Sequence, residues 1–252
     1  MSEPLIVIED LQKSFGKQTI LDHLNLTINR GDSVVIIGQS GTGKSVLLKH
    51  LIRLMEPDGG RILFDGRDIA QLEPKELVAL RLRFGMLFQS AALFDSMTVE
   101  ENVGLGLKES RQYGTDEIHS IVLEKLEMVG LTDAADKYPS ELSGGMRKRV
   151  GLARAIAHNP EVLLYDEPTT GLDPITSDVI NDLIVELNNK LKVTSITVTH
   201  DMISAFKVAN RIVMLHQGKV EFDGTPTETF STQNPFVRQF IAGNATGPIQ
   251  VR

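Results

Sequence analysis

The stretch that decides the fold is VVIIGQSGTGKSVLLKHLIRLM, residues 34–55. Its β-branched beginning predicts a strand, the small residues from Gly38 to Gly43 predict a tight loop, and the apolar periodicity that follows predicts a helix over about 46–55. Glycines let the loop curl so that successive backbone N–H groups face one anion, and the helix N-terminus adds a favourable dipole. The pattern G-x-x-x-x-G-K-[ST] between a strand and a helix therefore predicts a phosphate-binding loop.

Two side chains of this loop have distinct chemical tasks. Lys44 supplies a mobile positive charge for the β- and γ-phosphates of a nucleotide, and the Ser45 hydroxyl is a hard oxygen ligand for Mg²⁺. The alternative interpretation is an ordinary glycine-rich turn with a surface lysine, which the complete motif in its strand–helix context disfavours. The residues expected to contact the nucleotide here are Gly38, Gln39, Ser40, Gly41, Thr42, Gly43, Lys44, Ser45 and Val46.

The bulk composition limits which classes of protein remain. The 252 residues are 41% hydrophobic and 23% charged, which is typical of a globular domain that can contain subdomains. A formal net charge of -7 argues against a nucleic-acid binder with a broad basic face, and the lack of cysteine excludes disulfides and thiolate sites. The segment MSEPLIVIED lacks the features of a signal peptide, and no apolar run reaches the roughly 20 residues of a membrane span. We therefore expect any membrane attachment to come from partner chains.

Strands and helices alternate along the chain, which predicts an α/β fold. LIVIEDLQKSFG and QTILDHLNLTINRGD predict an antiparallel region, and RIVMLHQGKVEFDGTP predicts a hairpin with Gly218 at its turn. The short apolar runs SVVIIG, EVLLYDEP and TSITVTHD predict strands buried on both faces of a parallel sheet. The tail NATGPIQVR is expected to be loosely ordered. Further helices are expected over about 75–83, 117–128, 144–158, 176–191 and 202–209.

A second motif, VLLYDEP, narrows the chemistry. It places Asp166 at the end of an apolar strand, where a carboxylate can hold Mg²⁺ through water. Glu167 follows directly, within reach of a water molecule that attacks the γ-phosphate. An acidic pair at a strand end is often only a solvated loop entry. Combined with the phosphate loop, the pair favours hydrolysis over phosphate transfer to a second substrate.

A third motif, ELSGGMRKRVGLARAIAHNPEV, predicts a second anion-binding helix start. Ser143 is expected to be the N-cap, and Gly144 and Gly145 expose their N–H groups at the positive end of the helix dipole. Because one phosphate loop already serves one triphosphate, this second helix start suggests a composite site shared between two copies of the chain. A plain capped helix with flexible glycines is the alternative. The run RKR at 147–149 is interpreted as a solvated helix face and not as a nucleic-acid contact.

Taken in order, these motifs resemble the nucleotide-binding domain of ATP-binding-cassette (ABC) transporters over residues 4–240. GQSGTGKS resembles the Walker A loop, LLYDE the Walker B strand with its catalytic glutamate, and LSGGM the family signature. Met146, Phe15 and Tyr165 depart from the commonest family residues, but none of them removes a group that the chemistry needs. The resemblance implies further roles: Gln89 as the Q-loop glutamine, Asp173 as the D-loop aspartate, His200 as the switch histidine on the γ-phosphate, and Phe15 as the aromatic that stacks on adenine.

The resemblance also implies an architecture and an activity. The expected fold is that of a P-loop NTPase: a RecA-like, mostly parallel sheet core with an N-terminal antiparallel β region, an inserted α-helical subdomain over about 90–158, and a short C-terminal tail over 241–252. The implied activity is that of a Mg²⁺-dependent ATPase that binds ATP in a homodimer. Each ATP would lie between one phosphate loop and the partner's signature segment. The implied catalytic residues are Lys44, Glu167 and His200, and the implied Mg²⁺ ligands are Ser45, Gln89 and Asp166.

One segment points to a subfamily. QSAALFDSMTVEENV, together with Met146, is similar to the ATPases of Mla/Mce-type phospholipid transport systems. That similarity implies a peripheral subunit on the cytoplasmic face of the bacterial inner membrane, a multi-pass permease and a periplasmic or membrane-anchored lipid-binding subunit, without nucleic acid. Leu93, Phe94 and Met97 would then be partly exposed for docking to the permease, with core packing as the alternative.

Two other classes of function stay open. The first is an ABC ATPase for the import of a small polar solute such as an amino acid, which only the neighbouring subunits would distinguish. The second is a soluble cassette ATPase in translation or DNA repair, although such proteins usually carry two cassettes or a long coiled-coil insertion, and this chain shows neither.

Overall fold

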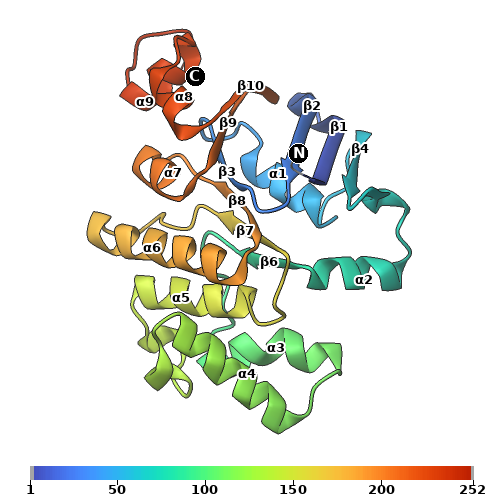
Figure 1. Ribbon diagram of the computed structural model, residues 1–252, viewed down its shortest axis with the longest axis vertical. Coiled ribbons are helices and arrows are strands. Elements are labelled where there is room, and N and C mark those ends of the chain that lie inside the picture. Colours follow the sequence, from blue (N-terminus) through green and yellow to red (C-terminus); the bar gives the residue numbers. More distant parts are fainter. Residues whose placement is uncertain (1–2, 251–252) are drawn as a thin grey trace. The chain divides into compact units, whose positions relative to one another are not determined.

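The computed structural model describes residues 3–250, and contacts within the chain divide it into two compact units. Unit 1 comprises the chain up to Leu77 together with the part that begins at Ile196. Unit 2 runs from Val78 to Ser195. The chain therefore leaves unit 1 once and returns to it once, so that unit 2 is continuous in sequence (Figure 1).

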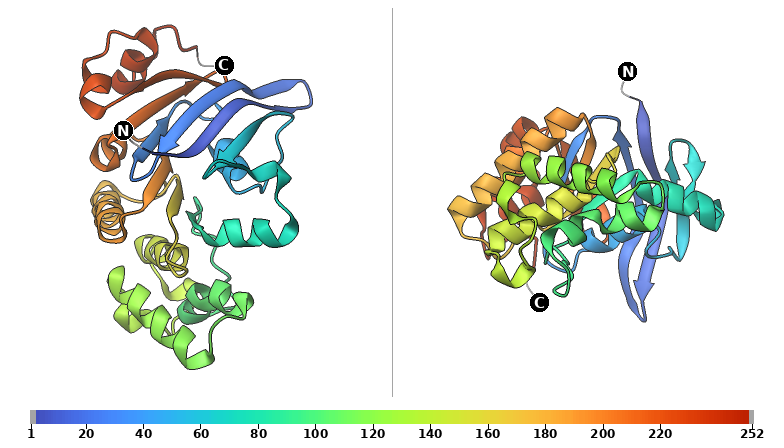
Figure 2. Two further views of the ribbon diagram at one scale, coloured as in Figure 1. Left: turned by 45° about the vertical axis from the view of Figure 1, so that its right-hand side comes forward. Right: turned by 90° about the horizontal axis from the view of Figure 1, so that it is seen from below.

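Unit 1 contains an antiparallel sheet whose strands lie in the order β2-β1-β4-β5. The two long strands β1 and β2, which lie side by side in Figure 2, pair through a tight hairpin in which Phe15 is opposite Gln18. Gly16 in this turn has φ 58°, the left-handed region that glycine enters without strain. The predicted antiparallel region is confirmed, whereas the pattern analysis did not anticipate its last two strands. The strands are β1 (Pro4–Phe15), β2 (Gln18–Asn29), β4 (Gly59–Phe64) and β5 (Arg67–Asp68).

The second sheet of unit 1 is mixed. Strand β3 (Ser33–Ile37) pairs in parallel with β9 (Arg211–His216), and β9 pairs antiparallel with β10 (Lys219–Gly224) around the predicted turn at Gly218. Strand β8 (Thr194–Val198), within which the division between the units falls, lies next to β3. Both strands are almost entirely buried, as expected for short apolar runs in a parallel sheet. The helices of this unit are α1 (Lys44–Leu51), α7 (Met202–Val208), α8 (Pro226–Ser231) and α9 (Pro235–Ala242), with a short 3-10 helix η1 (Ile69–Gln71).

The C-terminal segment is held by one side chain. Gln239 on α9 donates from Nε2 to the carbonyl oxygen of Ile249 at 3.0 Å, and its Oε1 accepts from the Ile249 N–H at 2.7 Å. The Ile249 side chain is buried. The expectation of a loosely ordered tail is therefore wrong at Ile249, because the Gln239 amide binds both backbone groups of that residue. The residues 244–248 before it are exposed and belong to no helix or strand. Residues 251 and 252 of the predicted tail lie outside the described residues.

Unit 2 combines a parallel strand pair with four principal helices. Strands β6 (Phe84–Leu87) and β7 (Val162–Asp166) are parallel, with Phe84 opposite Val162. Helices α3 (Val99–Ser110), α4 (Thr115–Met128) and α5 (Gly144–Ala155) pack against one another, and α6 (Pro174–Leu191) packs against α5. Helix α2 (Pro74–Leu82) contains the point where the chain passes between the units, and η2 (Thr132–Ala134) and η3 (Pro139–Glu141) are short 3-10 helices. The range 90–158 as a separate subdomain stays a prediction.

The sequence pattern did not predict helix α3, although the first turn of this helix carries a clear signal. The Thr98 hydroxyl accepts from the Glu101 N–H at 3.2 Å, while the Glu101 carboxylate accepts from the Thr98 N–H at 2.8 Å. This reciprocal pair is a capping box, which the letters TVEE encode. The helix interior contains two glycines, Gly104 and Gly106, which weaken the apolar pattern and explain why it was missed.

The α/β fold with a mostly parallel core and an antiparallel region agrees with the sequence-based expectation. Within residues 3–250, none of the helices has both the length and the apolar character that crossing a bilayer demands.

Strand β7 is held to its surroundings by a buried polar chain. The Tyr165 side chain is fully buried and donates its hydroxyl to Asn188 Oδ1 at 3.0 Å, and Asn188 Nδ2 donates to Ser195 Oγ at 2.9 Å. Burial raises the pKa of Tyr165 above its ordinary value, so the hydroxyl remains a neutral donor. The phenol thus donates to the oxygen of a buried asparagine.

We expect Tyr165→Phe to lower the free energy of unfolding by about 1–3 kcal/mol, because it removes the hydroxyl donor from a buried amide oxygen. Denaturant unfolding followed by circular dichroism measures the change. Tyr138→Phe is the matched control, since Tyr138 is 45% exposed, and a change within about 0.5 kcal/mol is expected there. Equal effects of the two substitutions would contradict a structural role for the Tyr165 hydroxyl.

Candidate active site

The phosphate-binding loop predicted in unit 1 connects β3, which ends at Ile37, to α1, which begins at Lys44. Gly38, at φ 149°, lies so close to β9 that an added Cβ would come within 2.5 Å of the Leu215 carbonyl oxygen. Gly43 has φ 95°, and its Cβ would come within 2.9 Å of the Leu21 side chain. Each of these positions therefore requires glycine for both conformation and space.

The loop winds around the ammonium group of Lys44. This side chain is only 6% exposed, and Nζ donates to the carbonyl oxygens of Gly38 at 2.7 Å and Gln39 at 2.9 Å. The Thr42 hydroxyl donates to the same Gln39 oxygen at 2.9 Å. Gly43 is the N-cap of α1 and has no side chain to accept from the first turn. The loop thus combines a positive charge with the N-terminus of a helix, which is the arrangement that binds phosphate.

Unit 1 also carries two further residues predicted to contact the nucleotide, Phe15 and His200. Phe15 ends β1 with its ring 49% exposed, and Lys13 Nζ lies 5.7 Å from the ring centroid. An exposed aromatic ring at a strand end is suited to stacking on a base. His200 is exposed and follows Thr199, whose N–H donates to the Ile36 carbonyl at 3.2 Å, so the end of β8 lies beside the strand that leads into the loop.

Unit 2 carries the predicted acidic pair at the end of β7. Asp166 is the last residue of a fully buried strand and is 7% exposed. Glu167 follows with φ 49°, an uncommon conformation for a residue with a side chain. Its Oε2 accepts from the Thr170 hydroxyl at 3.1 Å. The carboxylate therefore has a defined orientation, and Thr170 is a contributor that the motif analysis did not identify.

The predicted signature segment begins α5, with Ser143 as its N-cap. The Ser143 hydroxyl accepts from the Met146 N–H at 3.3 Å, and the side chain is exposed. Gly145 lies against the beginning of α6, since an added Cβ would come within 2.7 Å of the Thr176 methyl group. Asp173 caps α6 by accepting from the Thr176 hydroxyl at 2.5 Å and from two backbone N–H groups, which holds the pKa of Asp173 below its ordinary value. The structure thus shows a capping role for Asp173, while its contact with nucleotide stays a prediction.

The interpretation of 147–149 as a solvated face is wrong for Lys148. This side chain is 5% exposed, and Nζ donates to the Gln89 carbonyl at 2.5 Å and the Glu167 carbonyl at 3.1 Å. Burial lowers the pKa of Lys148 to about 8, although the carboxylates of Asp166 and Glu167 oppose the shift. Helical spacing alone could have found this residue, because Lys148 lies five residues after the Ser143 N-cap, close in angle to the buried Gly145 and Leu152.

The segment after Gln89, which is itself exposed, is held by side chains from α5 and α3. Arg154 on α5 donates to the carbonyl oxygens of Ala91 at 2.6 Å and Ala92 at 2.7 Å. Asn102 on α3 is fully buried, and it both accepts from the Phe94 N–H at 2.8 Å and donates to the Phe94 carbonyl at 3.1 Å. Phe94 is consequently presented with its ring 50% exposed. Asn102 is a further residue that motif analysis missed, because nothing in EENV marks its role.

The donor types predicted for Mg²⁺ are a hydroxyl, an amide and a carboxylate: Ser45 in unit 1, and Gln89 and Asp166 in unit 2. All are hard oxygen ligands of the kind that Mg²⁺ prefers. Among the described residues no cluster of three or more His, Cys, Asp or Glu could hold a metal ion.

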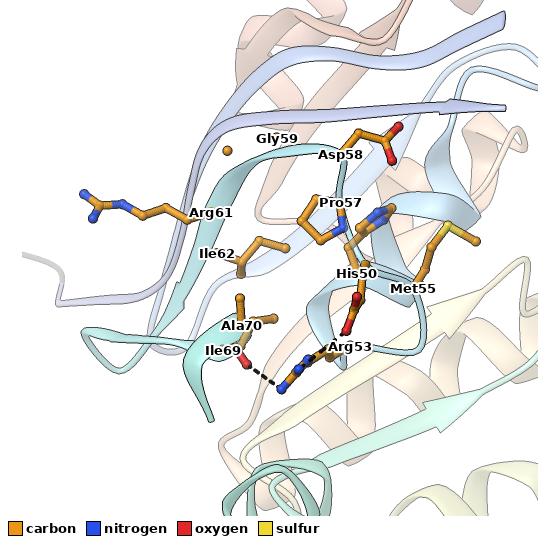
Figure 3. A pocket seen from close by; sticks show the side chains of 12 residues that line it. His50, Arg53, Met55, Pro57, Asp58, Gly59, Arg61, Ile62, Ile69 and Ala70 are labelled. Atoms are coloured by element: carbon orange, nitrogen blue, oxygen red, sulfur yellow. Dashed lines mark hydrogen bonds and ion pairs between the residues drawn. The ribbon is translucent and has the colours of Figure 1, made fainter. Parts of the chain in front are cut away.

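A cavity of about 370 Å³ lies elsewhere in unit 1, between the end of α1 and the strand β4 (Figure 3). His50 in its wall is 1% exposed, and burial lowers the pKa of His50, so that Nδ1–H of the neutral ring donates to the Val46 carbonyl at 2.7 Å. Asp58 in the wall accepts from Lys13 Nζ at 2.8 Å and from the Ser14 N–H at 2.7 Å. None of the predicted nucleotide-binding residues lines this cavity. Its wall residue Asp58 instead holds the end of β1, which carries Phe15. Its lining is His50, Arg53, Met55, Glu56, Pro57, Asp58, Gly59, Gly60, Arg61, Ile62, Ile69 and Ala70.

Comparisons with known proteins agree on one family. Residues 21–170 match the family described as "ABC transporter". The chain is 42% identical to the intermembrane phospholipid transport system ATP-binding protein MlaF of Haemophilus influenzae over 252 residues, which are 100% of this chain and 96% of that protein. It is 43% identical over 244 residues to the probable ribonucleotide transport ATP-binding protein mkl of Mycobacterium leprae, covering 97% of this chain and 70% of that protein.

Solved structures give the same result. The dimeric structure of MJ0796, described as a bacterial ABC transporter cassette, superposes with a TM-score of 0.81 and 34% sequence identity, covering 88% of this chain and 99% of that one. The dimeric structure of a post-hydrolysis state of MJ0796 bound to ADP and Pi gives a TM-score of 0.80 at 33% identity, with the same coverage. Since the family match spans more than half of the chain and a relative at 42% identity is covered almost from end to end, the chain belongs to the ABC transporter family.

Proposed function

We propose that the chain is the ATP-hydrolysing subunit of a transporter that moves phospholipid between the inner and outer membranes of a bacterium. The observation that carries this proposal is the 42% identity to MlaF of Haemophilus influenzae, which extends over 100% of this chain and 96% of that protein. The relative mkl is named for ribonucleotide transport, but the match covers only 70% of that longer protein. It therefore supports a ribonucleotide as the cargo less directly than MlaF supports phospholipid. A small polar solute remains the alternative cargo.

In the proposed hydrolysis the residues of each unit have their own tasks. Bound Mg²⁺ would neutralise part of the phosphate charge. Lys44 exchanges its bonds to loop carbonyls for the β- and γ-phosphate oxygens, and Phe15 stacks on the adenine. The Glu167 carboxylate accepts a hydrogen bond from the attacking water and increases its nucleophilicity, while His200 contacts the γ-phosphate. Ser45, Gln89 and Asp166 would supply the oxygen atoms that hold the Mg²⁺.

The start of α5 supplies the reason for a homodimer. Ser143 is exposed at the N-terminus of a helix whose first residues are glycines, so N–H groups there can meet an anion from another chain. We infer that each ATP is bound by the phosphate loop of one copy and by the Ser143–Gly145 segment of its partner. Hydrolysis then removes the γ-phosphate that holds the two copies together, and the opening of the dimer is the mechanical output.

We expect Glu167→Gln to bind ATP normally and to slow hydrolysis by at least about a hundredfold, because the amide cannot act as the acceptor for the attacking water. Phosphate release under saturating ATP measures the rate, and a fluorescent nucleotide measures the affinity. Lys44→Ala should instead weaken nucleotide binding. Glu186→Gln, which changes an exposed glutamate on α6, serves as the control with wild-type turnover. Near-normal hydrolysis by Glu167→Gln would contradict the role proposed for this carboxylate.

The shared site predicts a complementation pattern. Ser143→Arg should abolish hydrolysis and leave ATP binding to the monomer intact, because the arginine blocks only the surface that faces the partner's nucleotide. When this variant is mixed with Lys44→Ala, each heterodimer should regain one working site, so that two inactive proteins produce ATPase activity together. Activity of the mixture that does not exceed the sum of the separate variants would contradict a composite site.

We propose that the Phe94 region is the docking surface for a multi-pass permease. Loop 89–98 is clamped from below by Asn102 and Arg154, while the Phe94 ring is 50% exposed and Leu93 and Met97 are partly exposed. A rigid loop that presents an apolar anchor is suited to receive a helix from a partner. The chain would then lie peripherally on the cytoplasmic face of the inner membrane, with a lipid-binding subunit on the far side.

We expect Phe94→Asp to leave the fold and nucleotide affinity unchanged and to weaken the association with the permease at least tenfold, since aromatic anchors often contribute about 2 kcal/mol or more. Affinity purification from membranes, with identification of the co-purifying proteins and lipids, measures the association. Val179→Asp is the matched control, because Val179 is 41% exposed on α6. Phospholipid should accompany the wild-type complex. If the permease instead co-purifies with an amino-acid-binding or nucleotide-binding subunit, the chain still belongs to the ABC transporter family, but the proposed phospholipid cargo is contradicted.

A further inference from the structure

One ammonium group in unit 2 connects three segments that the proposed mechanism treats separately. Lys148 extends from the buried face of α5, where its side chain is 5% exposed. Its Nζ lies 2.5 Å from the carbonyl oxygen of Gln89 and 3.1 Å from that of Glu167. The signature helix, the Q-loop and the residue after the Walker B strand therefore meet at one charged group.

The contact with Glu167 is made to a residue whose backbone has an unusual conformation. Glu167 has φ 49°, a left-handed conformation that is unfavourable for a residue with a Cβ and that persists only where its surroundings hold it. The ammonium of Lys148 binds the carbonyl of this residue, and the Thr170 hydroxyl binds its carboxylate at 3.1 Å. The two bonds restrain opposite ends of the same residue, so they determine where the carboxylate points.

The contact with Gln89 is one of several hydrogen bonds by which side chains of α5 hold the Q-loop and the residues after it. Arg154 lies six residues after Lys148 on the same helix, and it donates to the Ala91 and Ala92 carbonyls at 2.6 and 2.7 Å. Ala91 and Ala92 have φ 61° and 48°, so this loop also adopts a strained conformation that α5 supports. A shift of α5 would consequently be felt by the Q-loop and by Glu167 together.

We propose that Lys148 is a positioning residue that sets the orientation of the Glu167 carboxylate and couples it to the Q-loop through the carbonyl of Gln89. The inference rests on the role proposed above for Glu167. A lysine suits this position because one compact ammonium offers three donors and can bind two carbonyl oxygens that arrive from different loops. In this role Lys148 acts through Glu167, whose carbonyl oxygen its ammonium binds.

The test is the steady-state kinetics of Lys148→Met in the ATPase. We expect kcat to fall roughly 10–100-fold because the carboxylate is no longer aligned with the attacking water, while KM for ATP stays within about twofold. Lys125→Met is the matched control: Lys125 is likewise buried at 3%, and its Nζ binds Glu124 and Asn159, both at 2.8 Å, without touching the site. It should share any loss of thermal stability but not the fall in kcat.

A double-mutant cycle with Glu167→Gln separates positioning from general damage. If Lys148 acts through the carboxylate, Lys148→Met should lower the residual single-turnover rate of Glu167→Gln by less than about twofold. An equal loss in both backgrounds, or an unchanged kcat in the single variant, would overturn the proposal. Should Lys148→Met fail to fold, Lys148→Gln replaces it in the same cycle, since its amide retains two donors. If Glu167→Gln alone keeps normal turnover, the proposed role of Glu167 fails first, and the positioning role fails with it.

Discussion

The bond between the Lys44 ammonium and the carbonyl oxygens of its own loop is the constraint on which unit 1 depends. A lysine that is 6% exposed would be strongly destabilising without partners, and here the Gly38 and Gln39 carbonyls satisfy it at 2.7 and 2.9 Å. Those bonds require the loop to curl back on itself, which in turn requires glycine at φ values that other residues avoid. The loop is thus organised around a charge, and the same ammonium is the group proposed above to bind phosphate oxygens.

In unit 2, too, positively charged side chains hold loops by binding backbone carbonyl oxygens, but here the carbonyls are distant in sequence. Two cations on α5, the buried Lys148 and the half-buried Arg154, bind backbone carbonyls of the Q-loop and of the residue that follows β7. Three of the residues whose loops they support (Ala91, Ala92 and Glu167) have positive φ values. Backbone strain of this kind collects where function demands an unusual geometry, and it persists because the surrounding bonds determine the conformation. The signature helix is therefore both a candidate anion site at its N-terminus and the support for the residues proposed to carry out hydrolysis.

This arrangement offers a physical route from chemistry to transport. The Phe94 loop is fastened to α3 through Asn102, and the segment before it is fastened to α5 through Arg154. A partner that docks on Phe94 would therefore act on two helices of unit 2 and not on a loose surface loop. For an ATPase whose relatives include an intermembrane phospholipid transport protein, such a connection would let the docked subunit influence the alignment of Glu167 without touching it.

The sequence alone determined the phosphate loop, the acidic end of β7, the capped start of α5 and the buried strands, because each depends on residue types at short, regular spacing. Local order also produced the family resemblance that the comparisons confirmed. Helix α3 could have been read from its capping box but was obscured by glycines. What only the tertiary structure decided are the contacts between distant segments: Gln239 with the C-terminal residues, Asn102 with the Phe94 loop, and Lys148 with Gln89 and Glu167. A hydrogen bond between residues 59 positions apart leaves no periodic trace in the chain. Helical spacing could place Lys148 on the buried face of α5, but only the fold brings its ammonium to the carbonyl oxygens that compensate for the lost water.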